Sequence, residues 1–309
     1  MSLRTIFLLS AGGYGLLALW FPLIRHVDRT PPGDIRTFAP TPLGGLAYSL
    51  LIIVLFALLV AAFRRAEESS PAKLTLPRVL AGSLVLALPL LLAYPINATD
   101  IFGYVIRGRI ASAYGESPFA APAAAFVGDP FMPLVGEWAG QTTPYGPLWE
   151  IIAAGLTAVS GGSLLWGVWL FKGLALLSFL ITTTLIWHVL PDNHRRSPYT
   201  LLWAWNPGLL LTFIMNGHND ALMLLWLVLG FAVACRGRPS AGFVIMVLAV
   251  LTKPVAVLAL PFFFIEFWRE LPAGRPRTPS QTNHNTNTAK NADNTSPIVS
   301  MAARPPRAM

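Results

Sequence analysis

Apolar residues fall in long runs along this chain. Four runs come close to or exceed the roughly 20 residues that a helix needs to cross a bilayer. These runs are Leu3–Ile24, Pro42–Phe63, Val79–Ile96 and Ser163–Leu190. Four shorter runs follow, with polar residues between them: Leu201–Met215, Ala221–Cys235, Ala241–Leu251 and Val255–Trp268. The pattern predicts an all-α integral membrane protein, a polytopic helical bundle with about seven or eight transmembrane helices.

The composition agrees with lipid as the main solvent. Hydrophobic residues make up 54% of the 309 residues and charged residues only 12%. A chain this apolar is neither an ordinary soluble enzyme nor an intrinsically disordered protein. The net charge of +8 comes with no basic stripe and no nucleic-acid motif, so we expect no nucleic-acid partner. The excess of Lys and Arg instead orients the chain in a bilayer.

Basic residues set the expected topology. Loop 64–78 carries four of them, which places it on the cytoplasmic side and residues 97–147 outside. Segment 148–160 is apolar, but as a helix it is only about 20 Å long, short of a hydrocarbon core of roughly 30 Å. We therefore expect a helix in the outer interface, with Trp149 and Glu150 at the headgroup level.

This topology brings two further polar segments to the outer face. Residues 216–220 lie between two short apolar runs, and residues 252–254 lie outside if 241–268 is a helical hairpin. The alternative is one kinked helix with Lys253 at mid-membrane. An isolated charge there costs at least ~2.5–3.5 kcal/mol unless it is paired.

The outer loop 97–147 has the composition of a sugar-binding surface. It is rich in aromatic residues, including Tyr145, and also contains Asp100, Glu116, Asp129 and Glu137. Aromatic faces pack on the C–H surfaces of sugars, and carboxylates accept hydrogen bonds from sugar hydroxyls. A loop of this length is usually functional or disordered, and its aromatic content favours function.

Asp100 and two arginines are the first candidates for chemistry. Asp100 is either a general base or an N-capping or interfacial aspartate at the start of a helix. Arg107 lies seven residues further on, so on a helix it returns to the same face as Asp100. Arg107 and Arg109 are either clamps for a phosphate group or arginines that snorkel to lipid headgroups.

His218, Asp220 and Lys253 are the second group of candidates. Polar groups at membrane depth are usually functional. His218 and Asp220 are candidates for orienting a substrate or holding a divalent cation, and Asp220 is alternatively the N-cap of the next helix. Lys253 either holds a lipid phosphate as a point charge or simply snorkels.

Several motifs occur together in an order that resembles a known family. They are Asp100-Ile-Phe-Gly-Tyr-Val-Ile-Arg-Gly-Arg109, Ser117-Pro-Phe, Asp129-Pro, Trp138, Thr143-Pro-Tyr-Gly-Pro-Leu-Trp149, Trp205-Asn-Pro, Asn216-Gly-His-Asn-Asp-Ala-Leu-Met223 and Leu251-Thr-Lys-Pro254. Over residues 95–265 the series resembles the polyprenyl-phosphate-mannose-dependent mannosyltransferases of the GT-C superfamily. The likeness is greatest to the alpha-(1→6)-mannosyltransferases that build lipomannan-type glycans in actinobacteria.

The resemblance implies a GT-C-like bundle with a catalytic outer loop, in which Asp100 is the general base. His218, Asn219 and Asp220 match the family's second polar motif, and Lys253 matches a Thr-Lys motif near the carrier phosphate. Asp129 and Tyr145 are further candidate substrate contacts. The implied partners are a polyprenyl-phosphate sugar donor, a glycan or glycolipid acceptor and the lipid bilayer. No cofactor is required, although a divalent cation is compatible with the motifs.

The apolar runs, the basic loops and the composition of the tail define the expected organisation. Transmembrane helices occupy residues 1–96, and the extracytoplasmic catalytic loop with its interfacial helix occupies 97–162. Further transmembrane helices with polar motifs at the outer face occupy 163–270, and a disordered tail occupies 271–309. We expect a multi-pass protein of the plasma membrane with its active site on the extracytoplasmic side.

Two departures from the family pattern keep other functions open. Ser117-Pro-Phe stands where Asn-Pro-Tyr is more usual, and the chain ends earlier than we expect for the family, in an asparagine-rich tail. The alternatives to a hexosyltransferase are therefore a lipid or sugar transporter or flippase, or a catalytically inactive, truncated membrane subunit.

Overall fold

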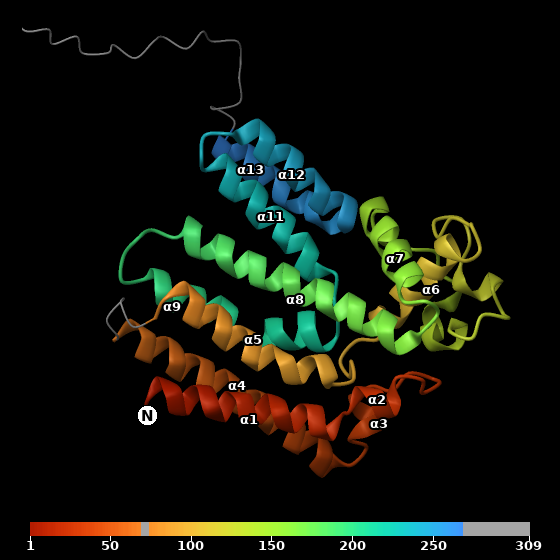
Figure 1. The fold of residues 1–309 in the computed structure, drawn as a ribbon, viewed down its shortest axis with the longest axis horizontal. Helices are drawn as coiled ribbons and strands as arrows, with labels where there is room; N and C mark the ends of the chain where they lie inside the picture. Colours follow the sequence, from red (N-terminus) through yellow and green to blue (C-terminus); the bar gives the residue numbers. More distant parts are fainter. Residues whose placement is uncertain (69–73, 268–309) are drawn as a thin grey trace, which may run out of the picture. The chain divides into compact units, whose positions relative to one another are not determined.

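The computed structural model describes residues 1–68 and 74–267, and this part of the chain is built from helices, with no β-strand (Figure 1). The predicted disordered tail, 271–309, lies outside the described residues. The helices before the outer loop are α1 (Leu3–Trp20), α2 (Leu23–His26), α3 (Ile35–Phe38), α4 (Pro42–Glu67) and α5 (Leu76–Leu92). The predicted outer loop with its interfacial helix, residues 97–162, contains α6 (Asp100–Ser112), the 3₁₀ helices η2 (Ala123–Ala125) and η3 (Met132–Gly140), and α7 (Pro147–Val159).

The remaining helices follow the outer loop. They are α8 (Leu164–Val189), α9 (Arg196–Ala204), α10 (Pro207–Leu209), the π-helix η4 (Leu210–Met215), α11 (Asp220–Ala234), α12 (Pro239–Thr252), η5 (Pro254–Ala259) and α13 (Leu260–Phe267). Helices α1, α4, α5, α8 and α9 lie side by side, α11 packs on α8, and α6 and α7 pack together at one end of these helices (Figure 1).

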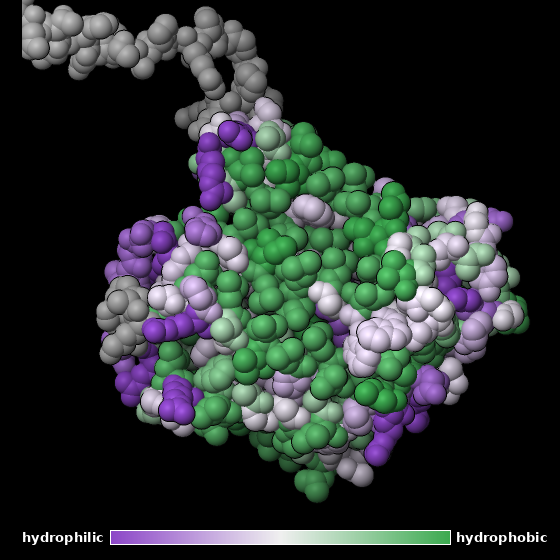
Figure 2. All heavy atoms as spheres, in the orientation of Figure 1, coloured by the Kyte–Doolittle hydropathy of each residue, from purple (hydrophilic) through white to green (hydrophobic). Residues whose placement is uncertain are grey.

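Three of the described helices, α1, α4 and α8, are long and apolar enough to cross a membrane. Helix α4 shows why lipid must be the solvent, because large apolar side chains such as Leu43 and Ile53 are 74% and 62% exposed. Figure 2 shows a broad apolar surface between two hydrophilic margins. A continuous apolar surface of this kind is unfavourable in water, so the chain is a membrane protein.

The predicted helix Leu201–Met215 is wrong as a single element. Helix α9 begins earlier, at Arg196, and ends at Ala204. The side chain of Asn206 then caps a new helical start by accepting hydrogen bonds from the backbone N–H groups of Gly208 and Leu209. Pro207 has no backbone N–H to donate into the preceding turn, so the apolar run divides at this point.

Residues 239–267 form a hairpin rather than one kinked helix. Helix α12 ends at Thr252, and Lys253 has an extended backbone with φ −147° and ψ 115°. The chain then turns back, so that Phe263 packs against Phe243 and Met246 of α12. Lys253 therefore stands at the turn of the hairpin.

Helix α7 has the predicted short length, but two of its side chains do not lie where the sequence pattern places them. Trp149 and Glu150 are 2% and 5% exposed, because both face α6 and α8 in the interior. Neither side chain is therefore open to lipid headgroups. The exposed side of α7 is apolar instead, with Ile151 and Val159 uncovered.

Candidate active site

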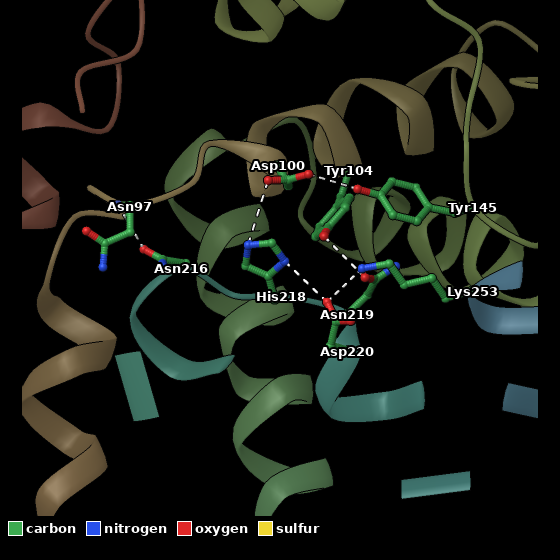
Figure 3. A network of polar contacts seen from close by, with 9 residues as sticks. All are labelled: Asn97, Asp100, Tyr104, Tyr145, Asn216, His218, Asn219, Asp220 and Lys253. Atoms are coloured by element: carbon green, nitrogen blue, oxygen red, sulfur yellow. Dashed lines mark hydrogen bonds and ion pairs between the residues drawn. The ribbon is translucent and has the colours of Figure 1, made fainter. Parts of the chain in front are cut away.

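Asp100 is the first residue of α6, and its side chain is held by residues far away in the sequence (Figure 3). The hydroxyl of Tyr145 donates a hydrogen bond to Oδ1 at 2.9 Å, and Nε2 of His218 lies 3.7 Å from Oδ2. Thr99 occupies the N-cap position, so Asp100 does not act as the helix cap. The carboxylate is 39% exposed and points toward partners that a capping role would not require.

His218, Asp220 and Lys253 continue this polar network (Figure 3). Nδ1 of His218 lies 3.3 Å from Oδ2 of Asp220, and Nζ of Lys253 donates to the same oxygen at 2.7 Å. Burial alone pushes the pKa of Asp220 upward, but the contacts with His218 and Lys253 outweigh it and lower the pKa to about 2. Asp220 precedes the apolar run 221–235, and Asn219 takes the N-cap position, so Asp220 is an ion-pair partner rather than a cap.

Asp100 and Arg107 line one cavity of about 230 Å³. Its walls come from the start of α6, from η3 and from the segment before α7, and the lining residues include Gly103, Val135, Trp138 and Tyr145. The predicted common face of Asp100 and Arg107 is therefore present. Arg107 is 7% exposed, and its Cζ lies 5.7 Å from the ring centroid of Tyr145.

Arg107 carries a buried positive charge without a neutralising ion pair. No carboxylate within the described ranges forms an ion pair with it. Gly103 makes room for the guanidinium, because a Cβ atom at Gly103 would lie 3.1 Å from Nη1 of Arg107. A buried cation at the wall of a cavity is a suitable site for an anionic ligand.

Arg109 and Asp129 do not lie in this cavity. They form an ion pair of 2.7 Å, in which the Asp129 side chain is completely buried. The hydroxyl of Tyr114 and the backbone N–H of Phe131 also donate to Asp129, each at 2.8 Å. Both side chains hold the segment after α6 in place, and neither lines the Asp100 cavity, so their predicted contact with a substrate stays a prediction.

The comparison with protein families identifies the kind of protein that contains this site. A family model described as the N-terminal domain of alpha-(1→6)-mannopyranosyltransferase matches residues 5–269. The chain belongs to this family.

Three curated relatives are about 30% identical to this mannopyranosyltransferase family member over the aligned part of the chain. Alpha-(1→6)-mannopyranosyltransferase A of Corynebacterium glutamicum is 30% identical over 57% of this chain and 36% of its own length. The protein of the same name in Mycobacterium tuberculosis is 31% identical over 65% of this chain and 39% of its own length. Alpha-(1→6)-mannopyranosyltransferase B of C. glutamicum is 27% identical over 66% of this chain and 34% of its own length.

The chain thus spans less than two fifths of the length of these curated relatives. No solved structure matches it.

Two glycines allow the separate segments of this family member's site to meet. A Cβ atom at Gly146 would collide with the carbonyl oxygen of Leu251. The backbone N–H of Gly146 donates a hydrogen bond to the carbonyl of Thr252. This contact places Tyr145 beside Lys253, whose Nζ lies 5.9 Å from the tyrosine ring centroid. Gly217 has a φ of +68° and packs on Ile101, which lets the 216–220 turn approach α6.

Lys172 is a structural residue near the site, and its position inside an apolar run left its role ambiguous in the sequence. It is fully buried in α8, and its Nζ donates to the carbonyls of Leu90 and Ala93 at the end of α5. The Leu90 carbonyl also accepts from the backbone N–H of Ala93. Carbonyls in the last turn of a helix lack the donors that a continuing helix would supply, so the lysine stabilises the helix end that leads to Asp100. The signal in the sequence was a charged residue inside an apolar run.

The sequence pattern did not single out Tyr104 or Asn216. The Tyr104 hydroxyl donates to Oδ1 of Asn219 at 3.4 Å, and the backbone N–H of Asn97 donates to Oδ1 of Asn216 at 3.3 Å (Figure 3). Both contacts join the 216–220 turn to the beginning of the outer loop. Asn219, a predicted substrate contact, therefore has a second role in positioning the turn.

Two groups near the cavity have shifted protonation equilibria. Burial and then the charge of Asp100 raise the pKa of Tyr145, so its hydroxyl keeps its proton and donates to the carboxylate. Burial also raises the pKa of Glu150, against the opposing effects of the Thr143 hydrogen bond and the charge of Arg107. Oε2 of Glu150 is buried and has no hydrogen-bond partner.

The possible cation site at His218 and Asp220 does not fit a divalent metal. Oδ2 of Asp220 already accepts from the ammonium group of Lys253, which would repel a second cation. Within residues 1–68 and 74–267, no group of three or more His, Cys, Asp or Glu side chains could hold a metal ion.

Proposed function

We propose that this chain transfers mannose from a polyprenyl-phosphate donor to a glycan or glycolipid acceptor, with inversion at the anomeric carbon. The observation that carries the proposal is the cavity in which Asp100 and the unpaired cation Arg107 face the same space. A base for the acceptor and a positive charge for the leaving phosphate are the two groups that this reaction needs. Membership of the mannopyranosyltransferase family supports the sugar and the linkage.

Asp100 is the proposed general base. Tyr145 holds Oδ1 by donating a hydrogen bond, which leaves Oδ2 available to accept the proton of an acceptor hydroxyl. The acceptor oxygen forms the new bond to the anomeric carbon while the bond from that carbon to the phosphate oxygen breaks. Attack from the face opposite the phosphate converts a β-linked donor into an α-linked product, through a transition state with oxocarbenium character.

Arg107 and Lys253 are the proposed partners of the leaving phosphate. Polyprenyl phosphate departs with additional negative charge, and fixed cations stabilise that charge most strongly in the transition state. Because phosphate is a good leaving group, no general acid is needed. His218 and Asp220 orient Lys253 and Asp100 through the contacts of 2.7, 3.3 and 3.7 Å that connect them.

The proposed membrane arrangement is multi-pass, with about seven or eight spans and the site at the extracytoplasmic face of the plasma membrane. The three long apolar helices and four of the five shorter ones, all except α7, support the count. The short helix α7, with its apolar exposed side, supports an interfacial position at that face. We retain the division at residues 96, 162 and 270 as part of this proposal.

The family relationship supports a transferase over the transporter or flippase. The polar network also gathers at the ends of α6, α11 and α12, and not midway along the long helices. The transfer assay described next also tests the alternative of an inactive membrane subunit. A wild-type chain without transferase activity would support that alternative.

The test is Asp100→Asn in the purified chain in detergent, assayed with radiolabelled polyprenyl-phosphate mannose and an α-mannoside acceptor. We expect transfer to be abolished while expression, membrane insertion and thermal stability match the wild type. Asp28→Asn is the matched control, because Asp28 is an exposed aspartate of the preceding outer segment and should keep full activity. Near-normal transfer by Asp100→Asn would contradict the role of Asp100 as the general base. An inactive wild type would contradict the proposed function.

A further inference from the structure

A second and larger cavity adjoins the one at Asp100. It measures about 580 Å³, and we call it the outer groove. Its walls are residues 31–37 of the first outer segment and residues 135–138 of η3. Thr99, Val135 and Trp138 line both cavities, so the outer groove begins where the Asp100 cavity ends.

The outer groove presents an aromatic face beside acidic side chains. Trp138 is 59% exposed although it lies in a folded loop. Asp34 and Glu137 supply carboxylates on the two walls. Exposed indole faces pack on the C–H surfaces of sugars, and carboxylates accept hydrogen bonds from hydroxyl groups.

The charges of the outer groove disfavour an anionic ligand. Arg36 is paired with Asp34 at 2.6 Å, and Glu137 acts electrostatically on the same guanidinium. Two carboxylates against one cation leave the walls with one net negative charge. A phosphate group would be repelled here, in contrast to the Asp100 cavity with its unpaired Arg107.

We infer that the outer groove binds a neutral oligosaccharide, namely the acceptor sugars that follow the one being extended. This inference rests on the proposed transferase function. The acceptor's terminal hydroxyl would reach Asp100 through the junction at Thr99 and Trp138, while the preceding sugars occupy the groove. The site would therefore select for a chain of several sugars over a short acceptor, with Trp138 as the stacking platform.

The first experiment measures binding without turnover. The purified chain in detergent is titrated with linear α-(1→6)-linked mannosides of two and six sugars, and the dissociation constants are obtained by isothermal titration calorimetry. For Trp138→Ala we expect the dissociation constant of the hexasaccharide to rise about tenfold, equivalent to ~1.4 kcal/mol, and that of the disaccharide to rise much less. Glu137→Gln should weaken hexasaccharide binding in the same direction but by a smaller factor.

Trp166→Ala is the matched control. Trp166 is also 59% exposed, but it lies on α8 outside both cavities, where its ring contacts Trp169. Binding of both mannosides should be unchanged in this variant. If Trp138→Ala and Glu137→Gln bind the hexasaccharide like the wild type, or if Trp138→Ala weakens both mannosides equally, the outer groove is not an oligosaccharide site.

A second experiment separates the failure of this inference from the failure of the proposed function. The ratio of kcat/KM for the hexasaccharide to that for the disaccharide should fall about tenfold in Trp138→Ala. If the wild type is active and the ratio is unchanged in Trp138→Ala, the oligosaccharide site in the outer groove is contradicted and the transferase function is not. If the wild type binds the hexasaccharide through Trp138 but transfers no mannose, the transferase function is contradicted and the oligosaccharide site is not.

Discussion

Arg107 and Arg109 lie on two sides of helix α6, and they differ in whether an ion pair neutralises their charge. On one side Arg107 faces a cavity, beside Asp100 and without an ion-pair partner among the described residues. On the other side Arg109 is neutralised by the completely buried carboxylate of Asp129, which accepts two further hydrogen bonds. The two residues are only two positions apart, yet Arg109 holds the loop through its ion pair, whereas Arg107 faces a cavity that could receive a ligand.

The comparison indicates how to recognise a binding cation in a site of this kind. A buried charge is costly, and a protein normally neutralises it with an opposite charge. Arg109 follows that rule, so its role is complete within the folded chain. The fold leaves Arg107 unneutralised at a cavity wall, and a bound anion would supply the missing charge.

Arg107→Gln should cause the strongest change, which is a loss of catalysis. Loss of the cation removes stabilisation of the leaving phosphate, so kcat should fall about 100- to 1,000-fold. Thermal stability should change little, because no carboxylate loses an ion pair. Transfer assays with saturating donor, together with a thermal unfolding curve, measure both effects.

Arg195→Gln is the control for Arg107, since Arg195 is exposed on the loop between α8 and α9. It should keep both activity and stability. A large loss of stability in Arg107→Gln with an unchanged kcat would reverse the roles that we assign to the two sides of α6.

The second effect is on stability, from Arg109→Met. The substitution leaves the buried carboxylate of Asp129 without its cation, which should ease local opening of the outer loop by about 3 kcal/mol. Hydrogen exchange of residues 113–141 measures this opening. The double variant Arg109→Met with Asp129→Asn should recover part of the loss, because the neutral side chain needs no cation. Its amide oxygen can still accept from the backbone N–H of Phe131, and its NH2 group can donate to the hydroxyl of Tyr114.

A different result would show that Arg109 has a second role. If Arg109→Met leaves the exchange rates unchanged but lowers kcat as strongly as Arg107→Gln, then Arg109 acts on the substrate after all.

The weakest predicted effect concerns Glu150 of α7, a buried carboxyl group on which the charge of Arg107 acts. Because burial raises its pKa above the usual 4.5, the folded protein binds the proton more tightly than the unfolded chain does. The free energy of unfolding therefore decreases as the pH rises from the ordinary pKa through the raised one. Glu150→Gln removes this penalty and keeps an acceptor for Thr143, so its Tm should match the wild type at pH 4 and exceed it at pH 8.

The same measurement can contradict the assignment. A Glu150→Gln variant with a lower Tm at pH 8 would mean that attraction between the Glu150 carboxylate and Arg107 outweighs the cost of burial.

Local patterns in the sequence predicted much of this architecture. The apolar runs predicted α1, α4, α5 and α8 to within a few residues at most ends, because hydropathy depends on each residue's own solvent. The spacing of seven predicted that Asp100 and Arg107 share a face, because the helical period is local too. The division of α9 from η4 was missed, although Asn206-Pro207 marks it, because the apolar character continues across the break.

The convergence of the site could not be predicted in this way. Tyr145, His218 and Lys253 come from three distant segments, and the close backbone approach at Gly146 brings two of them together. The burial of Trp149 and Glu150 likewise depends on the packing of α7 against α6, which a short apolar helix does not reveal by itself.

The helical structure, the lipid environment and the motifs of a mannopyranosyltransferase family can all be inferred from the order of the residues. Which charges are neutralised follows only from the folded arrangement, because Arg109 has an ion-pair partner and Arg107 has none among residues 1–68 and 74–267. The physical reason is that hydropathy and helical period are properties of neighbouring residues. Neutralisation of a charge depends on which groups the fold brings within a few ångströms and removes from solvent.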